Sequence, residues 1–111
     1  MEQKDPLPSG RITHPGATRV SGADIPRFKL LRGETAAQHF PAEAKAAKLK
    51  GTVKVDLLLN DMGQVLEAQV ISEAPKGKGF GLAALDAAKT FEFENPLHKM
   101  VLLSMDVEFT P

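Results

Sequence analysis

Hydrophobic and polar residues alternate in three segments of the C-terminal two-thirds of the chain. In residues 52–59 the apolar positions of the alternation are Val53, Val55, Leu57 and Leu59. Turn-forming residues follow at 60–63, and a second alternating segment occupies residues 64–72. Residues 100–109 alternate again, with five apolar positions on one side. A period of two is typical of a strand with one buried face, so we predict three strands, the first two joined in a β-hairpin.

Two further segments carry the wider spacing of a helix. Residues 41–50 begin with proline, which suits the first helical position because that position needs no N–H donor. Gly51 follows as the expected stop signal. The second segment, residues 80–91, has an apolar stripe at helical spacing: Phe80, Ala84, Ala87, Ala88 and Phe91.

The order helix, strand, strand, helix, strand predicts an α+β fold. If the third strand lies beside the first, the three-stranded sheet has the order 2-1-3, every neighbour is antiparallel and both helices cover one face. The expected core comprises Val53, Val55, Leu57, Ala84, Ala88, Phe91, Leu103, Met105 and Val107. The other face is expected to be solvated, and strands two and three are expected to be sheet edges. That face carries Lys54, Asp56, Gln69 or Glu67, Asp106 and Glu108.

The N-terminal third lacks such periodicity. Residues 1–24 are rich in proline and glycine, which favours a disordered or extended leader over the alternative of a structured arm. Residues 25–31 allow a short strand, which Pro26 would confine to an edge or to its first positions. We therefore divide the chain into a leader, residues 1–33, and a domain, residues 34–111.

Composition excludes several functional classes. Lys plus Arg and Asp plus Glu number 14 each, so no net basic field favours nucleic acid or an anionic membrane. The chain has no cysteine, which excludes disulfides and thiol chemistry. No stretch approaches the roughly 20 apolar residues of a membrane helix, and the N-terminus lacks the apolar core of a signal peptide. The native protein is therefore expected either to be cytoplasmic or to have lost an export or anchor segment.

Groups that could carry out chemistry are sparse. His14, His39 and His98 are scattered, which favours exposed loop histidines over a metal site. Asp106 and Glu108 share one strand face, which fits a paired-carboxylate site but fits a solvated sheet surface better. The glycine- and lysine-rich loop at residues 76–79 precedes a helix, as in some anion sites, but it lacks the Walker spacing. We therefore expect no enzyme activity, no metal and no cofactor.

Five motifs, in this order, resemble those of the TonB C-terminal domain family. They are Phe40-Pro41-Ala42-Glu43-Ala44, Gly51-Thr52-Val53-Lys54-Val55, Asp61-Met62-Gly63-Gln64-Val65, Val70-Ile71-Ser72 and Phe91-Glu92-Phe93. They are similar to the family's Tyr-Pro-x-x-Ala, its Gly-x-Val-x-Val, its Asp-x-Gly-x-Val turn, its strand ending in valine and serine, and its Trp-x-Phe. Phe40 and Phe91 stand where the family has Tyr and Trp. The resemblance covers residues 37–110.

The resemblance implies a periplasmic domain that is anchored to the inner membrane in the full-length protein. Such a domain binds the TonB box, a short segment of an outer-membrane transporter, by strand addition. It transmits force from the ExbB–ExbD motor of the inner membrane. The alternative is an envelope scaffold or protein-interaction module with a TonB- or TolA-like fold. We expect a monomer or weak homodimer that binds no nucleic acid.

The predicted partner-binding residues come from two segments. The resemblance nominates Gln38, His39 and Phe40. The last strand, as an edge with unpaired main-chain groups, contributes Met100, Leu102, Ser104, Asp106 and Glu108. Two alternatives stay open: the acidic residues protect this edge from pairing, or residues 25–31 fold back and block it.

Overall fold

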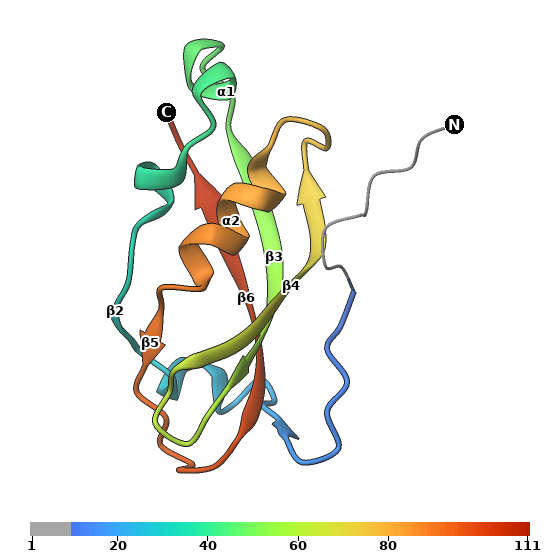
Figure 1. Ribbon diagram of the computed structural model, residues 1–111, viewed down its shortest axis with the longest axis vertical. Helices are drawn as coiled ribbons and strands as arrows, with labels where there is room; N and C mark the ends of the chain where they lie inside the picture. Colours follow the sequence, from blue (N-terminus) through green and yellow to red (C-terminus); the bar gives the residue numbers. More distant parts are fainter. Residues whose placement is uncertain (1–9) are drawn as a thin grey trace.

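The structure, a computed structural model, describes residues 10–111 (Figure 1). Its long strands are β3 (Gly51–Leu59), β4 (Val65–Ala74) and β6 (Val101–Phe109), and its α-helices are α1 (Ala42–Ala46) and α2 (Phe80–Ala88). The shorter elements are β1 (Thr18–Arg19), β2 (Leu30–Arg32), β5 (Glu92–Phe93) and the 3-10 helices η1 (Ile25–Arg27) and η2 (Ala36–His39). Within residues 10–111, no helix has the length and apolar character needed to cross a membrane.

The main sheet has the strand order β1-β6-β3-β4. Its central strand, β3, is antiparallel to both long neighbours, and its pairing with β6 runs from Gly51–Phe109 to Leu59–Val101. In Figure 1, α2 lies across one face of this sheet. The predicted α+β class, the order of the main elements and the 2-1-3 arrangement of the long strands are confirmed.

The prediction of three antiparallel strands is wrong, because β1 adds a fourth strand parallel to β6. β1 has only two residues, too few to produce an alternating pattern in the sequence. A separate two-stranded sheet joins β2 to β5. The short strand expected at residues 25–31 is therefore shifted to Leu30–Arg32, and it pairs with the segment that follows α2 rather than with the main sheet.

The main core lies between the sheet and α2, and it contains every predicted core residue, with Met105 only partly buried. Three phenylalanines close one end of it. The ring centroids of Phe40 and Phe80 are 5.8 Å apart, and those of Phe80 and Phe109 are 5.1 Å apart. These separations are typical of favourable aromatic pairs, so Phe40 ties the chain before α1 to the sheet and to α2.

Both helices end earlier than predicted. After α1 it is Lys48, with φ +58°, that adopts the left-handed conformation, so the predicted role of Gly51 as the helix stop is wrong. Gly51 begins β3 instead, where a Cβ atom would lie 2.6 Å from the Phe80 ring. Glycine is needed there because Phe80 fills the space. Beyond α2, the Thr90 hydroxyl donates to the Ala87 carbonyl at 2.6 Å, and the chain turns toward β5.

The hairpin between β3 and β4 is closed by Asn60 and Gly63. The Asn60 side-chain oxygen accepts the N–H groups of Met62 and Gln64, each at 2.9 Å. Gly63 has φ +84°, and its carbonyl accepts the Phe93 N–H at 2.8 Å. A Cβ atom on Gly63 would lie 1.8 Å from the Phe93 carbonyl oxygen. The hairpin therefore depends on glycine for two reasons, its backbone conformation and its contact with β5.

We predict that Gly63→Ala destabilises the fold by about 3 kcal/mol or more, because the methyl group adds strain and drives the hairpin away from β5. The measurement is the urea midpoint of unfolding. Gly22→Ala is the matched control, since Gly22 has open space around it and is expected to change stability by less than about 0.5 kcal/mol. Equal midpoints for the two variants would show that the hairpin does not pack on Phe93 in solution.

Candidate functional site

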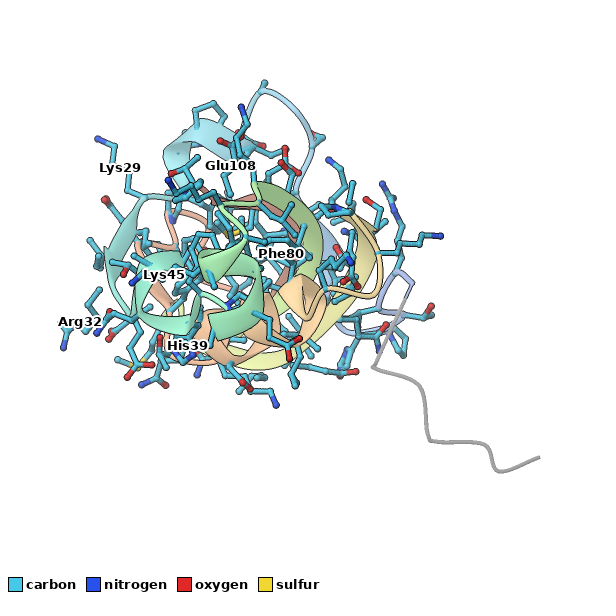
Figure 2. All side chains as sticks on the ribbon, turned by 90° about the horizontal axis from the view of Figure 1, so that it is seen from above. Lys29, Arg32, His39, Lys45, Phe80 and Glu108 are labelled. Carbon is cyan, nitrogen blue, oxygen red and sulfur yellow. The ribbon has the colours of Figure 1, made fainter. Side chains whose placement is uncertain are left out.

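Residues 10–20, called the arm below, cross the face of the sheet opposite α2. The Gly10 N–H donates to the Val70 carbonyl of β4 at 2.7 Å. At the opposite edge of the sheet, Thr18–Arg19 pair with β6. Between these points Ile12 packs on Leu58 and Leu102 in a second small hydrophobic cluster. In the view along the long axis, the arm and the two α-helices lie on opposite sides of the sheet (Figure 2).

The expectation that this whole face is solvated is wrong. Asp56 is completely buried, and Leu58 and Leu102 are buried beneath Ile12, whereas Lys54 and Asp106 farther along the strands are exposed. Thus the arm covers one half of the face. For the predicted leader, residues 1–9 lie outside the described residues, whereas residues 10–20 are docked on the sheet. The division of the chain at residue 33 stays a prediction.

Asp56 is the polar centre of the contact between arm and sheet. The Arg19 guanidinium donates to both of its carboxylate oxygens, with 2.9 Å between Nη2 and Oδ2. The Ile12 N–H donates to the same Oδ2 at 2.8 Å, and the Ser104 hydroxyl donates to Oδ1 at 2.7 Å. Sequence reasoning missed this cluster because its members come from three distant segments. The available signal was the pair of leucines, Leu58 and Leu102, on the expected polar face.

These hydrogen bonds decide the charge state of Asp56. Burial by itself raises the pKa of the carboxyl group, because it removes water from the charged form. The bonds from Arg19, from the Ile12 N–H and from Ser104 outweigh that effect, and the pKa of Asp56 lies below its ordinary value. The same contact raises the pKa of Arg19. The pair is therefore ionised at neutral pH.

The outer edge of β6 has a covered part and a free part. The carbonyls of Met100 and Leu102 accept the N–H groups of Thr18 and Val20 at 3.1 and 2.8 Å, which defines the covered part. Successive strand residues direct their main-chain groups to alternate edges, so Ser104, Asp106 and Glu108 direct theirs outward too. Within residues 10–111 no main-chain hydrogen bond reaches these outward groups. Residues 104–108 are the free part, and they offer unpaired donors and acceptors.

The predicted site residues of β6 fall in different surroundings. Met100 and Leu102 belong to the Ile12 cluster, and Ser104 is bonded to Asp56, so the arm covers these three rather than leaving them exposed. Asp106 and Glu108 are exposed. The Asp106 carboxylate lies 3.4 Å from the Lys54 ammonium across the strands, and Figure 2 shows Glu108 on the side of the sheet opposite Lys45 of α1.

The other three predicted site residues lie at η2, where the chain approaches the end of β6. Gln38 completes a capping box with Thr35, and His39 contacts the Glu34 carboxylate. The Phe40 ring packs on Phe109 with 5.7 Å between centroids. Phe40 is thus a partly buried core residue that joins this segment to β6, while Gln38 is exposed.

The described residues contain no group of three His, Cys, Asp or Glu side chains placed to hold a metal ion. His14 and His39 are engaged with separate neighbours, the Gly16 N–H and Glu34. The distinguishing features of the molecule are therefore a strand edge and the arm beside it, an arrangement suited to binding another chain.

The chain is similar to known proteins in its sequence pattern and in its fold. The model of the family described as Gram-negative bacterial TonB protein C-terminal matches residues 36–110. The solution NMR structure of the TonB C-terminal domain of Pseudomonas aeruginosa superimposes with a TM-score of 0.56 at 19% identity, covering 84% of this chain and 92% of that one. At that identity the likeness shows the fold. No curated protein matches the chain.

We predict that acid weakens the docking of the arm through Asp56. Its folded-state pKa lies below the ordinary 3.8, so the stabilisation is fully present above about pH 4 and is lost as the pH falls through the folded-state pKa. Unfolding of the wild type and of Asp56→Asn should be compared from about pH 6 to about pH 2. The wild type should lose up to about 1.4 kcal/mol per pH unit more than the variant. Asp106→Asn is the exposed control, and if Asp56→Asn changes the slope no more than this control does, the proposed ionisation is refuted.

Proposed function

Because this chain belongs to the family of TonB protein C-terminal domains, we propose that it binds a short segment of an outer-membrane transporter, the TonB box, as an added strand on β6. The family is one of energy-transducer domains and not of enzymes. In the proposed role the domain works in the periplasm, is anchored to the inner membrane in the full-length protein and transmits force from an ExbB–ExbD-type motor.

The observation that carries the proposal is the free part of the β6 edge. Ser104, Asp106 and Glu108 offer an N–H and a C=O each to an incoming strand, and each new main-chain bond contributes roughly 0.5–1.5 kcal/mol net. After the ordering of the peptide is counted, such a set supports micromolar rather than nanomolar affinity. Strand addition of this kind is an established mode of peptide recognition.

Side chains beside the edge would supply the specificity that main-chain bonds lack. Glu108 is exposed, with no ion-pair partner among residues 10–111, whereas Asp106 is already near Lys54. A segment carrying Lys or Arg opposite Glu108 would gain an attraction that salt weakens. At the other end of β6, Phe40 packs on Phe109, and in the proposed role the exposed Gln38 of the neighbouring η2 would contact a bound segment that extends past Glu108.

The pairing between β6 and β3 supports the force-transmitting role. The two strands are in register along the full length of β6, from Val101 to Phe109. A pull along β6 would load these hydrogen bonds together rather than one at a time. Phe109 is also fixed between Phe40 and Phe80, so the end of β6 is held by side chains as well as by the sheet.

We predict that a synthetic TonB-box peptide binds with micromolar affinity and shifts the amide resonances of residues 104–108. N-methylation of the peptide amides that face β6 should abolish binding, because each loses its hydrogen and adds a clash. N-methylation of the alternate amides should be tolerated, which makes the second peptide the matched control. Shifts confined to α1 and α2, or equal effects of the two methylation patterns, would favour the envelope-scaffold alternative over strand addition.

A further inference from the structure

The arm already occupies part of the edge on which the proposed partner would bind. β1 pairs with β6 in register from Thr18–Val101 to Arg19–Leu102, and it runs parallel to β6. The Thr18 and Val20 N–H groups donate to the outward carbonyls of Met100 and Leu102. These carbonyls belong to the same row as the outward groups of residues 104–108. An added strand that extended along the whole of β6 would therefore meet the arm.

The contacts between the arm and the sheet are few enough for a bound segment to replace them. β1 contributes only two residues to the sheet, whereas β3 and β6 pair over their full length. The arm is also held by the Arg19–Asp56 pair, by hydrogen bonds from the Gly10 and Ile12 N–H groups, and by Ile12 packing on Leu58 and Leu102. Once the arm is released, Asp56 becomes accessible to water, so the charge need not stay buried without a partner. The hydrophobic core between the sheet and α2 uses no residue of the arm except Val20.

We infer that the arm is an intramolecular competitor for the β6 edge, an inference that rests on the proposed strand addition. A partner segment confined to residues 104–108 binds beside the docked arm. A longer segment, running parallel to β6 as β1 does, displaces Thr18–Arg19. The geometry also specifies the chemistry of that partner. Its residue in register with Leu102 takes the place of Arg19 beside Asp56, and a basic side chain there restores the ion pair.

A reversible lock on the arm tests this inference. Extending the β1–β6 register by one residue puts Ala17 beside Met100, and both side chains pack on the Ile12 cluster. Neighbouring strands lie about 4.8 Å apart, within the range of a disulfide. The chain has no cysteine of its own, so Ala17→Cys with Met100→Cys forms one defined bridge. The same protein in its reduced form is the control.

The probes are two synthetic TonB-box peptides, one of about five residues for the free part and one extended to about nine residues for the whole edge. The long peptide should bind the oxidised protein about tenfold or more weaker than the reduced protein, while the short peptide binds both equally. Equal affinity of the long peptide for the two forms overturns the inference and leaves the proposed function intact. Failure of both peptides to bind every form overturns both.

A second variant covers the case in which the cysteine pair does not fold. Arg19→Ala removes the ion pair of the arm, and it should tighten binding of a long peptide that lacks a basic residue by about threefold to tenfold. Arg27→Ala is the matched control, because Arg27 lies on exposed η1 and pairs with Asp24 at 3.2 Å. Unchanged or weaker binding to Arg19→Ala, relative to this control, overturns the inference.

Discussion

The second half of β3 is buried on both faces, and much of the architecture follows from that constraint. Leu57 and Leu59 face the α2 core, while Asp56 and Leu58 face the arm. A carboxylate in such a position is tolerated only if hydrogen bonds replace its lost hydration, and Arg19, Ile12 and Ser104 provide them. The arm is therefore part of the folded structure over residues 10–20, because without it the far face would expose two leucines around a charge.

The sequence predicted those parts of the fold that depend on local pattern. Strands of nine or ten residues and a helix with an apolar stripe leave periodic signals, so β3, β4, β6 and α2 were identifiable. The arm left no such signal, because it docks through single residues such as Ile12 and Arg19, which lie 44 and 37 positions from their partner Asp56. Leu58 and Leu102 on the nominally polar face were its only trace. The role of Gly51 was misread for a similar reason, since the nearby Phe80 ring that excludes a side chain is remote in sequence.

The predicted binding residues also divide into those that follow from local sequence pattern and those that depend on distant contacts. The outward edge of β6 follows from strand alternation, so the residues that direct main-chain groups to this edge could be deduced once the strand order was correct. Which portion of that edge is covered could not be deduced, since a two-residue strand decides it. Phe40 was nominated by motif resemblance and proves to be a core residue that holds η2 against the end of β6. It would thus position Gln38 and His39 rather than contact a partner over a large area.

The Asp56 cluster also has an evolutionary consequence. Its residues come from the arm, β3 and β6, so a substitution of one residue changes how much each of the others contributes to the stability of the fold. A relative that loses Arg19 would retain a buried acid without its cation, and selection would then favour a neutral residue at position 56. A relative with no arm at all would favour polar residues at positions 58 and 102, where leucine would face water. Substitutions at these sites should therefore occur together across the family, and their joint pattern would identify the members that carry a docked arm.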